Sequence, residues 1–132
     1  MDKKALEKRT KDFAVQVARF IGSFSKGKAA DVIGYQLMRS GASVGANYRE
    51  ANRAQSDADF VHKMAIVEKE AAESQYWLEI LDELMLGDSE ERSRLIVECG
   101  ELVAIFTSAG RTLKARRLKS MAGSGNPRGS SK

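Results

Sequence analysis

A stripe of apolar residues recurs along residues 60–85 at alternating steps of four and three. It consists of Phe60, Met64, Val67, Ala71, Ser74, Leu78, Leu81 and Met85. Side chains at this spacing lie on one face of an α-helix, and so narrow a stripe is typical of helices packed lengthwise. A second stripe, interrupted by polar residues, precedes it: Ile33, Leu37, Ser40, Val44, Asn47 and Ala51. The two stripes predict two long helices joined by a short turn near residues 55–57.

Two further helices are predicted on either side of this pair. The first spans about residues 2–24 on a stripe of Leu6, Phe13, Val17, Phe20 and Phe24. The last follows residues 87–91 and ends near Met121, on a stripe of Leu95, Cys99, Leu102, Phe106, Ala109 and Leu113. The second and third helices are expected over about residues 29–54 and 57–86. All four stripes together predict an all-α fold.

Short polar segments predict where these helices end. Gly27 is a candidate C-cap of the first helix, and Ser56 or Asp57 is expected to cap the third. Asp88 with Glu91 three residues later is typical of a capping box at the start of the fourth helix, with Ser89 as the competing cap. We therefore expect an elongated, up-and-down antiparallel four-helix bundle over residues 1–122 and a disordered Gly/Ser-rich tail over residues 123–132.

Three glycines, Gly34, Gly41 and Gly45, lie inside the second helix. Each one costs up to ~1 kcal/mol relative to alanine in a helix interior. The apolar stripe continues past all three without changing phase, which favours close packing against a neighbouring helix, although a kink near Gly41 is the other interpretation.

The composition argues against metal, cofactor and enzyme chemistry. The chain has one histidine, His62, and one cysteine, Cys99, which are too few for a zinc site or for the paired Glu-x-x-His motifs of a di-iron bundle. No phosphate-binding glycine loop or nucleophile elbow is present. We expect no cofactor, no metal and no enzymatic activity. A long apolar run and a signal peptide are both missing, so the expectation is a cytoplasmic protein that does not insert into membranes.

Charge is segregated along the chain, whose formal net charge is +4. Acidic residues dominate from Asp57 to Glu91, and none follows Glu101, whereas basic residues continue to Lys132. Two interpretations stay open. The charges match one another within or between subunits, or the basic residues form a free surface for an anionic polymer.

Four residues are candidates for a polar network or a subunit interface. Ser43, Asn47 and Glu50 share one face of the second helix and interrupt its apolar stripe, so they either set helix register or contact a ligand. Trp77 starts a second stripe with Ile80 and Leu84, which predicts either a wide core face or a subunit interface.

Arg49 and Arg53 lie four residues apart on the second helix and share a face, as phosphate-binding arginines do. They could equally pair with the acids of the third helix. Together with the basic residues of the last helix they form the candidate nucleic-acid-binding set: Arg49, Arg53, Arg111, Lys114, Arg116 and Arg117.

Several motifs resemble one known family. Residues 43–50 (SVGANYRE), residues 59–63 (DFVHK), Glu70-Ala71 and residues 76–78 (YWL) are similar to the 23S ribosomal RNA intervening-sequence proteins. The resemblance implies an up-and-down four-helix bundle that assembles into a homopentameric ring. It also implies a relationship to the accessory variability determinant of diversity-generating retroelements, a basic pentamer that binds nucleic acid and a reverse transcriptase.

The expected function is therefore that of a non-enzymatic oligomer, a pentamer by resemblance, that binds RNA or DNA through basic side chains and phosphate contacts. A role as accessory to a reverse transcriptase follows from the same resemblance. The alternative is a structural or protein-interaction oligomer that binds no nucleic acid.

Overall fold

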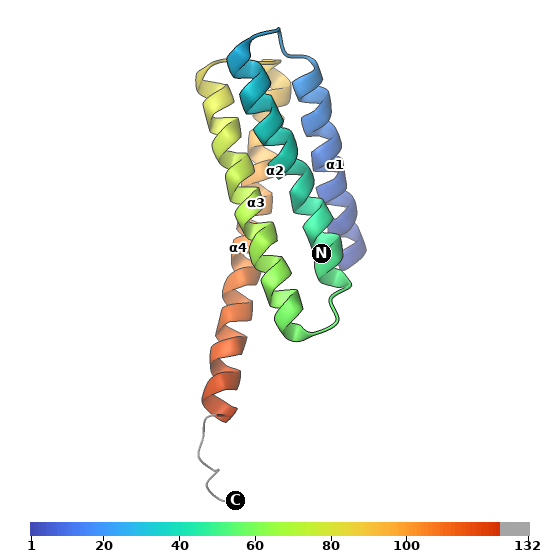
Figure 1. Ribbon diagram of the computed structural model, residues 1–132, viewed down its shortest axis with the longest axis vertical. Helices are drawn as coiled ribbons and strands as arrows, with labels where there is room; N and C mark the ends of the chain where they lie inside the picture. Colours follow the sequence, from blue (N-terminus) through green and yellow to red (C-terminus); the bar gives the residue numbers. More distant parts are fainter. Residues whose placement is uncertain (125–132) are drawn as a thin grey trace, which may run out of the picture.

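Four helices form the protein in the computed structural model, which describes residues 1–124 (Figure 1). They are α1 (Lys3–Gly22), α2 (Lys28–Asn52), α3 (Asp57–Glu83) and α4 (Ser89–Ser124). Each helix packs against the next one in the sequence, and α1 also packs against α4. The predicted all-α, elongated, up-and-down four-helix bundle is confirmed.

The tail expected over residues 123–132 falls mostly outside the described residues. Gly123 and Ser124 belong to α4, which therefore ends three residues later than the predicted end at Met121.

The predicted stripes form the core, with one exception. Val67, Leu78, Leu81 and Leu102 are fully buried. Stripe residues nearer the helix ends are half-buried and pack against this core: Phe24, Ile33, Phe60, Ala109 and Leu113. Met85, however, is 78% exposed. Helix α3 ends at Glu83 and Met85 adopts φ 53°, so the chain has already left the helix and the helical period no longer applies.

The helix starts follow the capping rules. Asp2 accepts a hydrogen bond from the Ala5 amide, Ser56 accepts one from the Asp59 amide, and Asp88 accepts one from the Glu91 amide. The assignment of Gly27 as a C-cap was wrong. Ser23 follows α1, and Gly27 lies immediately before α2, because α1 ends at Gly22.

The glycines of α2 bring α1 close, as expected from their position. A Cβ on Gly45 would lie 3.1 Å from Thr10 Oγ1, and one on Gly41 would lie 3.4 Å from a methyl group of Val17. Helix α2 continues through all three glycines without interruption. They therefore mark a close helix–helix contact and not a break.

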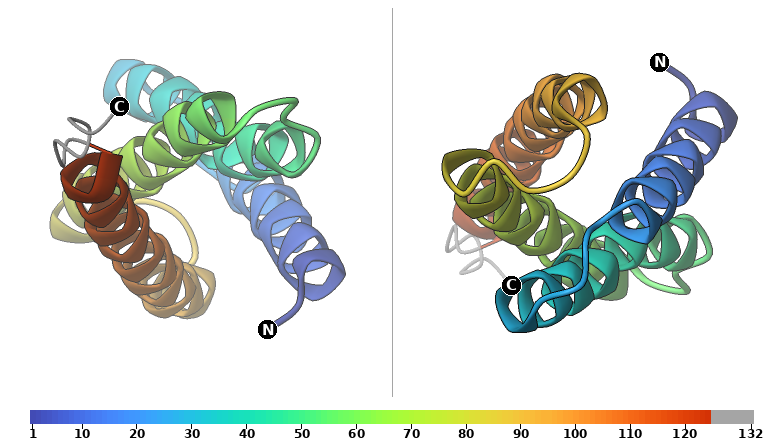
Figure 2. Two further views of the ribbon diagram at one scale, coloured as in Figure 1. Left: turned by 90° about the horizontal axis from the view of Figure 1, so that it is seen from below. Right: turned by 90° about the horizontal axis from the view of Figure 1, so that it is seen from above.

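The four interhelical contacts are unequal. Helices α2 and α3 share the most extensive interface, whereas α1 and α4 share the sparsest. Figure 2 shows α1 and α4 on the same side of the α2–α3 pair and spread apart from one another. Within residues 1–124, no helix has an apolar stretch long enough to cross a membrane.

Helix α4 is the longest of the four and continues past the end of the bundle (Figure 1). Its last side chain turned into the bundle is Leu113, which is half-buried, and residues 114–123 are all exposed. A basic, unpacked helical segment therefore projects from the end of the bundle at which α2 ends and α3 begins.

Candidate nucleic-acid interface

The projecting end of α4, residues 111–124, is called here the basic extension. It carries Arg111, Lys114, Arg116, Arg117 and Lys119, and no acidic residue. Among residues 1–124, none of these five side chains forms an ion pair with a carboxylate. Their charge is therefore open to solvent and to an anionic partner.

The sequence of the basic extension accounts for its helical form. It continues α4 without a break and consists largely of alanine, leucine, lysine and arginine, which favour helices. Leu113 is half-buried against the core, and residues 114–123 are all exposed, so core packing ends at Leu113.

Arg49 and Arg53 lie on α2 at the same end of the bundle. The Arg49 Nε atom is 3.9 Å from Glu7 Oε1, and the side chain stays 46% exposed, so this ion pair is weak. Arg53 directly follows α2 and is exposed. Neither arginine pairs with an acid of α3 among residues 1–124, so α3 does not neutralise their charge.

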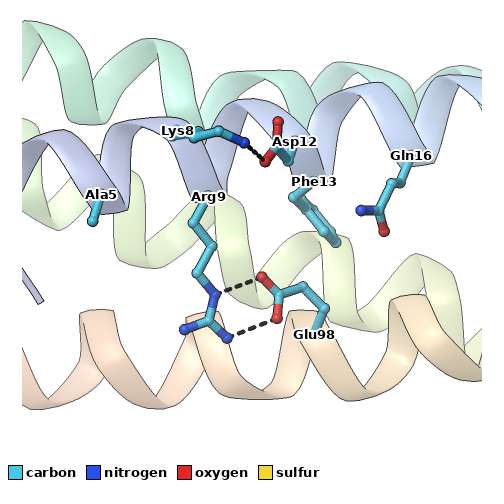
Figure 3. A pocket seen from close by; sticks show the side chains of 7 residues that line it. All are labelled: Ala5, Lys8, Arg9, Asp12, Phe13, Gln16 and Glu98. Atoms are coloured by element: carbon cyan, nitrogen blue, oxygen red, sulfur yellow. Dashed lines mark hydrogen bonds and ion pairs between the residues drawn. The ribbon is translucent and has the colours of Figure 1, made fainter.

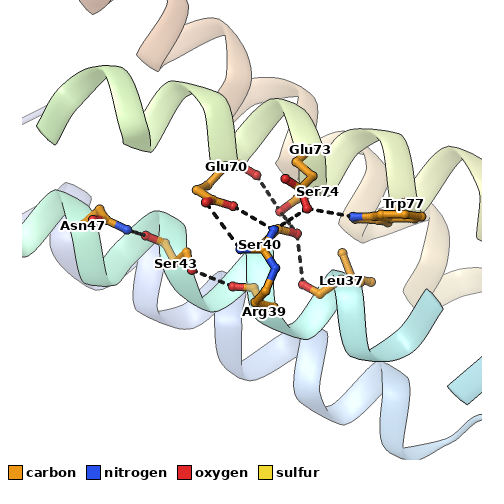
Figure 4. Close-up of polar contacts among 9 residues, drawn as sticks. All are labelled: Leu37, Arg39, Ser40, Ser43, Asn47, Glu70, Glu73, Ser74 and Trp77. Atoms are coloured by element: carbon orange, nitrogen blue, oxygen red, sulfur yellow. Dashed lines mark hydrogen bonds and ion pairs between the residues drawn. The ribbon is translucent and has the colours of Figure 1, made fainter. Parts of the chain in front are cut away.

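The acids of α3 have other partners, which the sequence analysis did not identify. Arg39 of α2 forms ion pairs with Glu70 and Glu73 of α3, and Trp77 Nε1 donates to Glu73 Oε2 at 3.2 Å (Figure 4). The hydrogen bonds that Arg39 donates to Glu73 and Glu70 raise the pKa of Arg39. Burial opposes ionisation of Glu73, but the bonds from Arg39 and Trp77 prevail and lower its pKa. This cluster of Arg39, Glu70, Glu73 and Trp77 links α2 to α3 near the middle of their interface.

Ser40 and Ser74 lie beside that cluster and are fully buried. Ser74 Oγ lies 2.8 Å from Ser40 Oγ and 2.9 Å from the Glu70 carbonyl oxygen. Small hydroxyl side chains at these two stripe positions allow α2 and α3 to approach closely, and they satisfy one another there.

Ser43, Asn47 and Glu50 were predicted to share one face of α2, and of the three only Glu50 has a hydrogen bond to α3 among residues 1–124. Ser43 Oγ donates to the Arg39 carbonyl and Asn47 Nδ2 donates to the Ser43 carbonyl, both within the helix. Glu50 is exposed and accepts a hydrogen bond from Lys63 Nζ at 2.7 Å, which lowers the pKa of Glu50 and raises that of Lys63. A role for these residues in a subunit interface stays a prediction.

Arg9 joins α1 and α4, the neighbouring helices with the sparsest interface. Its guanidinium donates two hydrogen bonds of 2.7 Å to Glu98 (Figure 3). It also donates one of 2.5 Å to Glu101. The bonds to Glu98 contribute most to raising the pKa of Arg9. A hollow of about 410 Å³ lies beside this bridge, between α1 and α4. Ion pairing here replaces part of the apolar packing that the other interhelical interfaces have.

Trp77 is half-buried, with its ring on the core and its edge against Tyr76. The half of the bundle where α2 begins and α3 ends exposes several large apolar side chains. We call this set the apolar surface: Val32, Tyr35, Tyr76, Leu84 and Met85. Trp77 therefore packs against the core. Because exposed apolar residues lie in the same half of the bundle, its role in a subunit interface stays a prediction.

Two comparisons with known proteins agree with this architecture. The family model described as 23S rRNA-intervening sequence protein matches residues 3–108. The crystal structure of a protein with unknown function from the S23 ribosomal protein family of Bacteroides thetaiotaomicron is similar, with a TM-score of 0.75 and 32% identity. The similarity covers 84% of this chain and 99% of that one. A search of curated proteins found no match.

Proposed function

Because this chain belongs to the 23S rRNA-intervening sequence protein family, we propose that it is a non-enzymatic, oligomeric helical bundle that binds nucleic acid through basic side chains. The observation that carries the proposal is the basic extension. It is exposed, free of acidic residues and outside the bundle, so its arginines and lysines can contact phosphates directly.

The binding residues in this proposal are those predicted from the sequence: Arg49, Arg53, Arg111, Lys114, Arg116 and Arg117. Phosphate contacts by such side chains fix position and supply affinity but carry no sequence information. The protein should therefore bind many sequences with similar affinity, and binding should weaken steeply with salt.

Self-association is the second part of the proposal. The family resemblance implies a homopentamer, and the apolar surface around Trp77 supports association of some kind, since exposed aromatic and aliphatic groups are enriched at interfaces. A protein-interaction role, including service as accessory to a reverse transcriptase, would use the same surface. In that alternative the bundle binds no nucleic acid, and the basic extension pairs with acids of α3 in a neighbouring subunit.

The test is binding of a structured RNA and of a DNA duplex across a salt series. The proposal expects the logarithm of the association constant to fall linearly with the logarithm of salt concentration, with a slope near −0.9 for each phosphate contacted on duplex DNA. Absence of binding at low salt, or an affinity that salt does not change, would contradict it.

Two measurements distinguish the remaining parts. Light scattering at micromolar concentration gives the oligomeric mass, and a monomeric mass would contradict self-association. Co-purification with a reverse transcriptase encoded nearby tests the accessory role. If the enzyme co-purifies while RNA and DNA do not bind, the protein-interaction alternative is the correct one.

A further inference from the structure

We infer that the basic extension enters the major groove of double-stranded DNA and does not follow a single strand. This inference rests on the proposed nucleic-acid binding and specifies its substrate. It follows from the shape of the extension, from the distribution of its charges and from the residue types that it lacks.

The shape is that of a helix leaving a helical bundle. Helix α4 passes from the packed part, where Phe106 is fully buried, into the exposed part without a break. Residues 111–124 span about 21 Å at 1.5 Å per residue. Basic helices that continue out of a coiled coil or a four-helix bundle lie in the DNA major groove in the bZIP and bHLH folds. The extension has the same relationship to its bundle.

The charges surround the helix. At 3.6 residues per turn, Arg111 and Lys114 lie on one side, Arg116 and Lys119 on a second, and Arg117 on a third, with roughly 90–140° between the groups. A flat, acidic protein surface would neutralise one of these sides and leave the others in water. A groove has a phosphate strand along each wall, so a helix lying in it is flanked by negative charge on both sides.

The dimensions favour B-form DNA. A helix with its side chains is about 10–12 Å across, and the B-form major groove is about 12 Å wide. The major groove of A-form RNA is deep and too narrow for side chains to read, so an unbroken RNA duplex should not accept the extension.

The composition argues against single strands. Proteins that bind single-stranded nucleic acid stack bases on aromatic side chains. No aromatic residue follows Phe106 within the described chain, and Phe106 is 1% exposed. The exposed aromatic residues Tyr35 and Tyr76 lie in the opposite half of the bundle, away from the extension. At the extension's own end, Phe60 is half-buried and packs against the core.

The experiment compares three probes with the full chain at 100 mM salt: a 20-base-pair DNA duplex, an RNA duplex of the same sequence, and the single DNA strand. Two variants each remove two charges from a different side of the extension, Arg111→Ala with Lys114→Ala, and Arg116→Ala with Lys119→Ala. The variant Lys26→Ala with Lys28→Ala removes two exposed charges from the far end of the bundle and controls for net charge. Circular dichroism confirms that each variant folds.

We expect the DNA duplex to bind at least about tenfold more tightly than the other two probes. Each extension variant should lose about tenfold or more in affinity for the duplex and reduce the salt slope by about 1.8, because each removes two phosphate contacts. The control should bind like the unmodified protein.

Two results would overturn the groove inference while nucleic-acid binding stands. One is equal affinity for the single strand or the RNA duplex. The other is a loss confined to one of the two extension variants, which would indicate a helix lying on a surface by one side only. If no probe binds, or if the control loses as much as the extension variants, the proposed function itself fails.

Discussion

Ser40 and Ser74 meet across the α2–α3 interface, with their hydroxyl oxygens 2.8 Å apart and both side chains fully buried. Each hydroxyl also has a backbone carbonyl within reach in its own helix, Leu37 for Ser40 and Glu70 for Ser74. The pair therefore lets two long helices approach closely at the level of the Arg39 ion pairs without leaving a donor unsatisfied.

Substitutions of Ser40 and Ser74 should have non-additive effects on the free energy of unfolding. Ser40→Ala or Ser74→Ala alone should lower the free energy of unfolding by about 1 kcal/mol, because one hydrogen bond is lost while the partner keeps its backbone acceptor. The double variant should cost less than the sum of the two. Urea unfolding of all four proteins measures this coupling, and strictly additive losses would contradict it.

Replacing Gly45 or Gly41 by alanine should change the unfolding free energy in opposite directions. Gly45→Ala should lower the unfolding free energy by about 1 kcal/mol, because its Cβ would press on Thr10 Oγ1 and, at 3.3 Å, on the Thr10 carbonyl carbon. Gly41→Ala meets Val17 at an ordinary distance and gains helix propensity, so it should be neutral or stabilising. Equal effects in thermal unfolding would show that α1 shifts freely at both sites.

Substitution of Arg92, which stabilises the α3–α4 connection, should greatly lower the free energy of unfolding. Its guanidinium is almost fully buried and donates to Asp82 Oδ1 and to the carbonyl oxygens of Leu86 and Gly87 at 2.8–3.0 Å. Arg92→Met should cost about 2–4 kcal/mol, since these carbonyls lose their partner. Arg94→Met, at an exposed neighbouring position, should change stability by less than about 0.5 kcal/mol. A small loss in the first variant would mean that water replaces the guanidinium.

Acid should weaken the α2–α3 interface first. The pKa of Glu73 is lowered from its ordinary value of 4.5, so its contribution to stability is present above that value and is lost as pH falls through the lower, folded-state pKa. Glu50, paired with Lys63, has the same sign. Thermal unfolding between pH 7 and pH 3 should show a falling Tm. The variant Arg39→Met, which cannot pair with Glu73, should lose part of that dependence, and an unchanged profile would contradict the assignment.

The basic extension should contribute nothing to the stability of the bundle. A chain ending at Leu113 keeps every buried residue, so its unfolding free energy should stay within about 0.5 kcal/mol of the full chain. A chain ending at Val103 loses the fully buried Phe106 and should be about 3–5 kcal/mol less stable. Destabilisation of the first chain, measured by urea unfolding, would indicate contacts of the extension with the bundle.

The sequence predicted what depends on local period and missed what depends on register between helices. The stripe from Phe60 to Leu81 was correct because burial repeats with the helical turn. Met85 was wrong because a change of backbone direction after Glu83 ends the period. The pairing of Arg39 with Glu70 and Glu73 could not be predicted, since a shift of one turn between α2 and α3 would have offered other acids.

The candidate site shows the same division. That the basic residues after Glu101 lack acids of their own is visible in the sequence, and their exposure follows from the end of the apolar stripe at Leu113. That α4 carries them clear of the bundle depends on where α2 and α3 end, which is known only once the four helices are aligned.

Helix α4 also begins in the packed bundle and ends outside it, which has a kinetic consequence. Starting a helix is the unfavourable step, and adding a residue to an existing helix is nearly neutral. Residues 114–124 continue a helix that starts at Ser89, so we expect them to lengthen and fray from the Ser124 side within nanoseconds to microseconds. Amide hydrogen exchange should therefore become faster from residue to residue toward Ser124. A partner that binds this segment should set how much of it is helical.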